Sequence, residues 1–458
     1  MTARTVVLAT DTFAPDHNGT ANFTKRLAVG LQLQGIEVHV IAPATSRLYG
    51  TFREKHDGVP IIVHRLKSSR IPLQPAQRFV SPIALTSKLK GLLKAISPDL
   101  VHIQSHINIG HHAALAAKEL GLRLVATNHV DAKSFVENAL VLPAFAKNFL
   151  ARTLIADSGR VMRLCDVVVT PSRIASELLT KSTGLAAVQT VSGGVNPAVY
   201  TDLPAPKQAD RVLTYVGRLD REKHVYVLLE AMAKLPSDFK LDLNIIGGGA
   251  QLDELKTLAA QLKIERRIHF LGELGDHEVV EELGRSSAFV MPSTQELLSL
   301  ATLEAMAAGR PVIAARALAL ADLVTDGTSG LLFQPDSAND LAKTIQVMFT
   351  QPEENFQSLA VAAKQTALNH SIENALAKYL AFYFGETAEQ PKNIQPILGS
   401  VRLGRAANGV IERLDGVRGQ VLETFTDARF TILRSTKSAR KKISRSLADA
   451  ISRIRKDD

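Results

Sequence analysis

The feature that most constrains the fold is an alternation of short apolar segments, rich in β-branched residues, with longer helical patterns. Helical stretches, such as residues 22–34 and 113–120, lie between most of the apolar segments. Strands that alternate with helices form parallel β-α-β units in a doubly wound sheet. The strands predicted in the first half of the chain are residues 4–10, 38–43, 60–66, 99–104, 123–128, 166–172 and 187–194.

The same alternation starts again after a connection near residues 196–210. A chain of 458 residues is too long for one hydrophobic core. We therefore predict an α/β protein with two successive Rossmann-like domains, residues 1–200 and 201–386, the second of which ends with a helix at 371–385. The strands predicted in the second half are residues 211–218, 241–249, 267–274, 287–293 and 310–316.

The basic character of the chain is concentrated in its last segment. Residues 391–458 hold 15 Lys/Arg and 7 Asp/Glu, so this segment carries +8 of the total net charge of +9. Apolar residues recur there at helical spacing, which predicts a basic amphipathic helical extension over residues 387–458. Nine Lys/Arg and one Asp lie between residues 434 and 456, a pattern that favours contact with an anionic membrane surface.

Other interpretations of this extension remain open. It could be a solvated helix or a helix that forms oligomers. Nucleic acid is a third partner class, but only Phe425 and Phe430 could stack on bases there, so no nucleic-acid binding is expected.

Cysteine usage and hydropathy indicate the compartment. The single cysteine, Cys165, excludes an intrachain disulfide and fits a reducing environment. The N-terminal apolar run is too short for a signal peptide, and no segment approaches the ~18–20 apolar residues that span a bilayer. The sequence therefore predicts a soluble protein, or one that rests on a membrane surface.

Two glycine turns lie where parallel strands lead into helices. Asn18-Gly19 follows the first strand, and Gly247–Gly249 follows a strand of the second half. Such a turn presents backbone N–H groups and a helix N-terminus to an anion, although it is also an ordinary β-α loop. The second turn lacks the full dinucleotide-binding spacing, because Leu252 stands where the third glycine is required.

Two cations follow the first strand of the second half. Arg218 and Lys223 lie at a strand-to-helix transition. Two cations directed at one point could neutralise a diphosphate leaving group, and a guanidinium can do so with two parallel hydrogen bonds. The simpler alternative is that both are solvated surface charges.

Two carboxylates, Glu296 and Glu304, lie eight positions apart in an apolar segment. They could be a catalytic pair, a metal site, a sugar clamp or surface charges. A helix predicted over 303–309 would place Glu304 near a helix N-terminus, and a carboxylate accepts two hydrogen bonds from a vicinal diol. No D-x-D and no nearby His/Cys cluster is present, so no metal site is expected.

Taken together these motifs resemble a known family. Gly217-Arg218 with Lys223, the E-x7-E of Glu296 and Glu304 followed by AMAAGRPVIA, and the DGTSGLLF of residues 326–333 look like a retaining glycosyltransferase of the GT-B fold, family four. The similarity runs in order from about residue 4 to about residue 385. It implies two Rossmann-like domains that face a cleft, in which a nucleotide sugar binds.

The resemblance also implies roles for individual residues. Arg218 and Lys223 would stabilise the departing diphosphate, Glu296 would hold the donor sugar, and His129 would approach that sugar from the N-terminal domain. A histidine at a strand end is more often a structural residue, and only its position after "VATN" distinguishes His129 from His102, His106, His111 and His112. Glu304 would bind the ribose. The remaining donor-binding positions would be Gly19, Gly217, Gly248, Leu274, Ser299, Leu300 and Ala301.

The chain departs from the common family pattern at two places. Leu298-Ser299 replaces an aromatic-Gly pair, and Leu318-Ala319 replaces two glycines. Ser299 is similar to a form found in lipid-directed glucosyl- and mannosyltransferases, and the FAPDHNGTANF segment (residues 13–23) resembles enzymes that glycosylate diacylglycerol or phosphatidylinositol-type lipids. The loss of the glycines puts donor-sugar contacts at 318–319 in question.

The expected activity is transfer of a hexose from a nucleotide sugar, UDP-glucose or GDP-mannose, to a membrane lipid without a metal or other cofactor. This would place the protein in the cytoplasm, on the inner face of the cell membrane. A soluble glycan acceptor, a nucleotide-sugar epimerase on the same scaffold, and a binder that has lost its activity remain alternatives.

Overall fold

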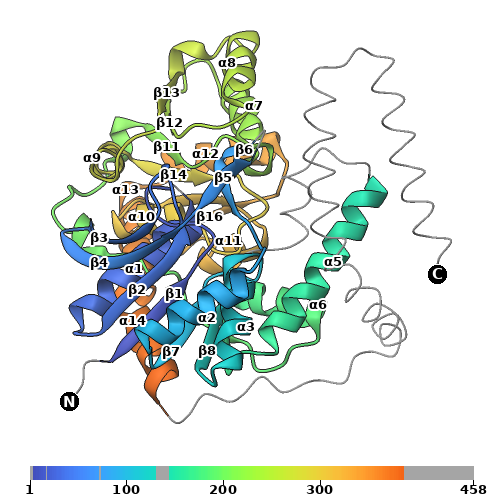
Figure 1. Cartoon of the computed structure of the whole chain (residues 1–458). Helices are drawn as coiled ribbons and strands as arrows, with labels where there is room; N and C mark the ends of the chain where they lie inside the picture. Colours follow the sequence, from blue (N-terminus) through green and yellow to red (C-terminus); the bar gives the residue numbers. More distant parts are fainter. Residues whose placement is uncertain (1–3, 17, 72–73, 130–143, 386–458) are drawn as a thin grey trace, which may run out of the picture. The chain divides into compact units, whose positions relative to one another are not determined.

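The computed structural model describes residues 4–16, 18–71, 74–129 and 144–385. These belong to one compact unit (Figure 1). The predicted basic extension, residues 387–458 with its 434–456 segment, lies outside the described residues.

The first half of the chain forms an eight-stranded sheet in the order β10-β9-β8-β7-β1-β2-β4-β3. All its neighbouring strands are parallel except β3, which pairs antiparallel to β4. Its strands are β1 (Thr5–Ala9), β2 (Glu37–Pro43), β3 (Gly50–His56), β4 (Val59–Leu66), β7 (Leu100–Ile103), β8 (Arg123–Thr127), β9 (Val167–Thr170) and β10 (Gln189–Thr190). Strands β5 (Ser68–Ile71) and β6 (Gln74–Val80) form a separate antiparallel hairpin.

Helices connect these strands and cover the sheet. Strands β7 and β9 are buried along their whole length, as expected for parallel strands with helices on both faces. The helices are α1 (Gly19–Leu33), α2 (Leu85–Ile96), α3 (Ile109–Glu119), α5 (Ala144–Met162) and α6 (Arg173–Thr183).

The second half forms a six-stranded parallel sheet in the order β13-β12-β11-β14-β15-β16. Its strands are β11 (Val212–Val216), β12 (Asp242–Ile246), β13 (Ile268–Gly272), β14 (Ala288–Met291), β15 (Val312–Ala315) and β16 (Gly330–Phe333). Its helices are α7 (Val225–Lys234), α8 (Leu252–Gln261), α9 (Asp276–Arg285), α10 (Leu300–Ala307), α11 (Leu318–Leu323), α12 (Ala338–Thr350) and α13 (Glu353–Asn369). Two Rossmann-like sheets are thus confirmed.

The strand orders locate one special point in each sheet. In the first sheet the order in which successive strands are added reverses between β1 and β7, and in the second sheet it reverses between β11 and β14. Open α/β sheets bind ligands beside such switch points, at the carboxyl ends of the strands. The loops that follow these four strands are therefore the first places to look for a site.

The final described helix, α14 (Ile372–Phe384), lies at the predicted place in the sequence but packs differently from the expectation. We expected it to end the second half, whereas it packs on the first sheet beside α1 (Figure 1). Tyr383 contributes to this attachment, because its hydroxyl hydrogen-bonds His102 Nδ1 on β7 at 2.6 Å. His102 is a buried structural residue, as predicted.

The chain therefore crosses between its halves twice, and the two crossings run side by side. The backbone N–H of Val195 donates to the carbonyl of His370 at 3.0 Å, and the N–H of Ile372 donates to the carbonyl of Val195 at 2.7 Å. Residues Val195 and Ser371 form an isolated parallel bridge.

Four observed features differ from or add to the sequence prediction. Strand β3 and the β5–β6 hairpin were not predicted, because β3 is almost entirely exposed and carries no alternating apolar pattern. Strand β16 is only four residues long and was also missed. Helix α10 begins at Leu300, three residues before the predicted start, since Ser299 caps it.

Candidate active site

The loops that follow β11 and β14 meet at the switch point of the second sheet. Lys223 Nζ donates to Glu296 Oε1 at 2.6 Å, and the two side chains are only 16% and 10% exposed. Tyr215 on β11 lies beside them: burial, and then the negative charge of Glu296, raise the pKa of its hydroxyl well above the usual value. Two of the predicted site residues therefore form a nearly buried ion pair.

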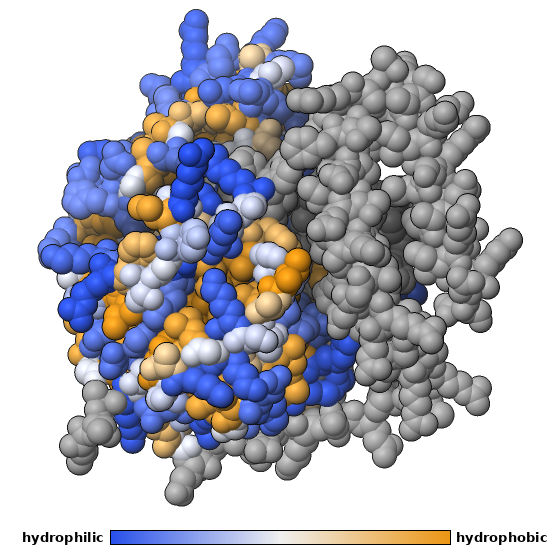
Figure 2. All heavy atoms as spheres, viewed as in Figure 1, coloured by the Kyte–Doolittle hydropathy of each residue, from blue (hydrophilic) through white to orange (hydrophobic). Residues whose placement is uncertain are grey.

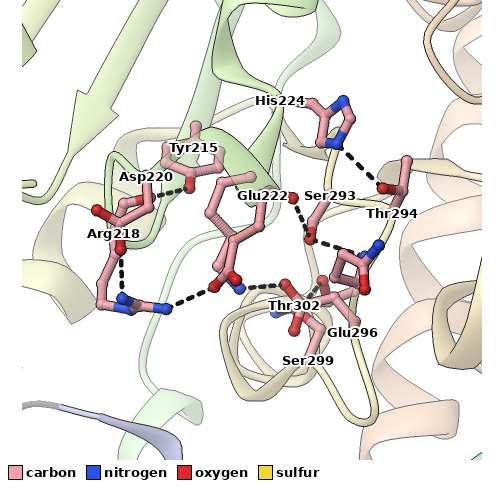
Figure 3. Close-up of polar contacts among 12 residues, drawn as sticks. Tyr215, Arg218, Asp220, Glu222, His224, Ser293, Thr294, Glu296, Ser299 and Thr302 are labelled. Atoms are coloured by element: carbon pink, nitrogen blue, oxygen red, sulfur yellow. Dashed lines mark hydrogen bonds and ion pairs between the residues drawn. The ribbon is translucent and has the colours of Figure 1, made fainter. Parts of the chain in front are cut away.

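Arg218 lies in the same loop but is more open to solvent. Its guanidinium pairs with Asp220 and, at 2.5 Å, with Glu222 (Figure 3). The Tyr215 hydroxyl donates to the backbone carbonyl of Arg218 at 2.9 Å and so fixes the start of the loop. Asp220 and Glu222, which were not predicted from the sequence, thus hold the positive charge of Arg218 near the Lys223–Glu296 pair.

The glycines of this region pack backbone against backbone. A Cβ on Gly247, whose φ is +133°, would lie 2.0 Å from the carbonyl oxygen of Gly217. A Cβ on Gly248 would lie 2.7 Å from Glu273 Oε1, the end of a flexible side chain that can move aside. Backbone packing between the two loops therefore accounts for the glycine at 247 without any ligand, but it does not require a glycine at 248. Leu274 lies partly exposed beyond β13.

Helix α10 starts directly after Glu296. The Ser299 side chain caps this helix, since its Oγ accepts from the N–H of Thr302 and from the Thr302 hydroxyl, the latter at 2.8 Å. Leu300 and Ala301 form the first turn, where backbone N–H groups have no partner within the helix. These N–H groups are available to an acceptor oxygen of a ligand.

The Glu296 loop is also held from the other side. The N–H of Ala319 donates to the Glu296 carbonyl at 3.1 Å, and the preceding Leu318 has a φ of +40°. Leucine rarely adopts this left-handed conformation, and glycine adopts it without cost. The backbone therefore keeps a glycine-like shape at 318 although the sequence has lost the glycine.

Glu304 has a partner from the first half of the chain. Its Oε1 pairs with Arg26 Nη2 of α1, and Arg26 Nη1 donates to the carbonyl of Gly194 at 3.2 Å. Burial alone would lower the pKa of Arg26, but the charge of Glu304 and its hydrogen bond raise it overall. Because α10 begins at Leu300, Glu304 lies in its second turn, and Arg26 rather than the helix N-terminus neutralises it.

His129 follows β8 of the first sheet and faces α1. Its Nε2 hydrogen-bonds Gln104 Oε1 at 3.0 Å, and its ring centroid lies 4.7 Å from that of Phe23. Burial lowers the pKa of His129 to about 3, so the ring is neutral near pH 7. It can exchange hydrogen bonds with a ligand but cannot act as a cation.

The turn after β1 has the geometry predicted for it. Asn18 caps α1, because its Oδ1 accepts from the N–H of Ala21 at 3.0 Å. Gly19 is exposed at the first position of the helix, and a Cβ there would meet nothing within 4 Å. No structural contact within the described chain therefore requires glycine at position 19.

Among the described residues, two buried polar atoms near the carboxyl ends of β7 and β8 have no hydrogen-bond partner: Gln104 Nε2 and, from α5, Ser158 Oγ. The side chains of His106 and Asn128 lie in the same region and hydrogen-bond each other. Buried polar groups are normally paired, so unpaired ones beside a switch point are available to a polar ligand or water. From the sequence we expected a purely structural role for His106 and no role for Gln104, Asn128 or Ser158.

The structure also brings residues together that the sequence did not associate. Arg26 was missed, although it lies two helical turns after Gly19 on the same face of α1. Ser172 was missed as well: its hydroxyl donates to the carbonyl of Leu297 at 2.5 Å and joins the first half to the Glu296 loop. The predicted site residues thus come from both halves of the chain.

Among the described residues, no cluster of three or more His, Cys, Asp or Glu side chains is suited to hold a metal ion. Within the same residues, no helix combines the length and the apolar character needed to cross a membrane. The metal-free chemistry expected from the sequence stays a prediction.

Comparison with known families covers both halves. Residues 17–199 match the family described as Glycosyltransferase Family 4, and residues 204–366 match the family described as Glycosyl transferases group 1. Together the two matches extend over most of the described chain.

Individual proteins give the same result. The chain is 29% identical over 339 residues to a GDP-mannose-dependent alpha-mannosyltransferase of Mycolicibacterium smegmatis, covering 72% of this chain and 84% of that protein. It is 26% identical over 376 residues to alpha-monoglucosyldiacylglycerol synthase of Streptococcus pneumoniae, covering 77% and 80%. The crystal structure of Anabaena HepE in complex with UDP and glucose has the same fold, with a TM-score of 0.65 at 18% identity, covering 83% of this chain and 99% of that one.

Proposed function

Because the chain belongs to the glycosyltransferases with the GT-B fold and is a hexosyltransferase that uses a nucleotide sugar, we propose that it transfers the hexose with retention of configuration to a membrane lipid. The observation that carries the proposal is the Lys223–Glu296 pair at the β11/β14 switch point. A carboxylate that holds sugar hydroxyls and a cation that holds a diphosphate are needed side by side at the bond that breaks.

In this proposal the donor's diphosphate lies against Lys223 and Arg218. The bond between the sugar's anomeric carbon and the diphosphate oxygen breaks, and the acceptor oxygen forms a bond on the same face. The acceptor proton moves to the leaving diphosphate. Cations that are fixed before the reaction stabilise the charge that develops on the leaving group, and no metal is required in this scheme.

The other site residues take roles around these groups. Glu296 and the N–H groups of Leu300 and Ala301 hold the sugar, and Glu304 holds the ribose diol. The neutral His129 contributes a hydrogen bond to a sugar hydroxyl. Gly19 leaves room for the phosphates to approach the N-terminus of α1.

The lipid acceptor is supported by the basic extension and by the relative that is named for a monoglucosyldiacylglycerol product. The other relative is named for GDP-mannose. Both donor types, GDP-mannose and UDP-glucose, remain candidates. The +8 of residues 391–458 supports attachment to the anionic inner face of the cell membrane, through residues 434–456.

The test is an incubation of the full-length protein with GDP-mannose or UDP-glucose, radiolabelled in the sugar, and a total membrane lipid extract. We expect label in the organic phase with one donor, and an α-linked sugar by NMR if the donor is α-linked. Label found only in aqueous glycan would support the soluble-acceptor alternative, and conversion of free nucleotide sugar without acceptor would support an epimerase. Nucleotide binding without turnover would support an inactive binder.

A further inference from the structure

A basic cavity lies in the first half of the chain, and none of its lining residues belongs to the site described above. It has a volume of about 490 Å³ and is lined by residues 45–47, by Tyr49, and by side chains of the β5–β6 hairpin and the residue before it. Its four cations are Arg47, Lys67, Arg70 and Arg78. None of its lining residues is a carboxylate.

One of these cations is fixed in place by neutral groups. Arg78 donates through Nη2 to the carbonyl of Thr45 and through Nη1 to the Ser68 hydroxyl at 3.4 Å, while Ser68 Oγ donates to the carbonyl of Ala44 at 2.6 Å. Within the described part of the chain, no carboxylate forms an ion pair with any of the four cations. Four positive charges around one cavity without a counter-charge repel one another, and an anion relieves that repulsion.

The cavity lies at a functional edge of the sheet. Its walls follow β2, which ends at Pro43, and β4, which ends at Leu66; in the sheet order β2 lies beside β1, and β4 lies beside β2. The carboxyl ends of parallel strands meet at one edge, so the cavity shares its edge with the Asn18-Gly19 turn. Neighbouring strands are about 4.8 Å apart, so β4 lies roughly 10 Å from β1.

Apolar residues accompany the cations. Leu48 and Tyr49 are 72% and 56% exposed. In Figure 2, which has the orientation of Figure 1, strongly hydrophilic side chains lie where Figure 1 shows β5 and β6, with hydrophobic residues close by. A phosphate ester with an apolar neighbour matches this surface better than a free sugar does.

We propose that the cavity of Arg47, Lys67, Arg70 and Arg78 binds a phosphate group carried by the acceptor. This rests on the proposed function in so far as the bound molecule is taken to be the acceptor. The phosphate could belong to a soluble phosphate ester or to a lipid headgroup, and the two sources are separated by the probe used.

The test compares the full-length protein with the double variant Arg47→Gln/Arg70→Gln, which keeps the structural Arg78. Lys55→Gln, an exposed cation on β3, is the matched control. The probes are glycerol 3-phosphate, followed by calorimetry, and phosphatidylcholine vesicles with and without phosphatidic acid, followed by co-sedimentation. All variants keep residues 387–458, so any contribution of the basic extension is the same in each.

We expect the double variant to bind at least one probe about tenfold more weakly than the wild type and the Lys55→Gln control. Weaker binding of glycerol 3-phosphate by the double variant would show that a soluble phosphate ester is enough for binding in the cavity. Weaker binding only of the vesicles with phosphatidic acid would show that the cavity binds a lipid headgroup. Equal binding by wild type and double variant, or equal losses in the double variant and the control, overturns the proposal. No donor is present, so a failure of the transferase activity leaves this result interpretable.

Discussion

The Lys223–Glu296 pair makes a quantitative prediction about folding stability. Lys223→Met leaves the Glu296 carboxylate without its cation at a site where that side chain is 10% exposed. Loss of one partner of a buried ion pair costs about 3–5 kcal/mol in the free energy of unfolding, and residual solvent places this case near ~3 kcal/mol. Glu296→Gln keeps an oxygen acceptor at the same place and replaces a charge-assisted bond by a neutral one, which costs about 1 kcal/mol.

The double variant Lys223→Met/Glu296→Gln contains no orphaned carboxylate. We expect it to be less destabilised than the sum of the single variants by about 1–2 kcal/mol. Urea unfolding at pH 7, followed by circular dichroism, gives the four free energies of this cycle. Each domain's transition is fitted separately where two are resolved, because a two-domain chain need not unfold in one step.

The Lys90–Glu119 pair serves as the control. Its atoms are 2.5 Å apart, but its side chains are 34% and 52% exposed, so the same cycle with Lys90→Met and Glu119→Gln should give a coupling of at most about 1 kcal/mol. Additive effects at Lys223 and Glu296, within about 0.5 kcal/mol, would refute the reasoning, because they would mean that the two side chains do not pair in solution.

Three further predictions concern the site. Arg26→Gln should strengthen binding of GDP or UDP by up to about tenfold, because Arg26 occupies a carboxylate oxygen of Glu304, the proposed ribose-binding residue, and Glu304→Ala should weaken that binding. Both affinities can be measured by calorimetry, and changes in the same direction would contradict the prediction. Gly19→Ala should unfold like the wild type yet bind nucleotide more weakly. Gly91→Ala, at a helical glycine whose added Cβ would likewise meet nothing within 4 Å, should leave nucleotide binding unchanged. Unchanged binding in both variants would mean that Gly19 is not part of the site. The pKa of His129 falls to about 3 on folding, so its contribution to stability is complete above about pH 6.5 and is lost as the pH falls towards 3. Urea unfolding at pH 7 and pH 5 should therefore show a smaller loss of unfolding free energy in His129→Gln than in the wild type, by at most about 1.4 kcal/mol per pH unit. An equal loss in both proteins would mean that another group takes up this proton.

The strands and their order of succession could be predicted because buried parallel strands leave continuous apolar runs in the sequence. Strand β3 could not, since an exposed edge strand keeps only its backbone pairing with β4. The packing of α14 was equally inaccessible: its apolar pattern predicts a buried face but does not say which sheet buries it. A local sequence pattern does not show which distant residues the segment will contact.

The site residues show the same division. The positions of Lys223, Glu296 and Glu304 followed from motif spacing, and the structure brings the first two into contact. Their counter-charges did not follow, because Arg26 is separated from Glu304 by more than half of the chain. The roles of all these residues towards a donor remain predictions that the variants above address.

The paired crossings at Val195 and Ser371 bear on how the enzyme could move. The second half is topologically an insertion, since the chain leaves the first half and returns to it at one hydrogen-bonded place. Two adjacent strands of backbone resist twisting and sliding more than they resist bending, so they define a single hinge axis. Rotation about that axis would break the polar contacts between the halves while both sheets stay intact. These contacts are Arg26–Glu304, Ser172–Leu297, Lys25–Asp276 and Arg173–Asp322. Entry of the donor and release of the spent nucleotide would thus be controlled by these contacts and one hinge.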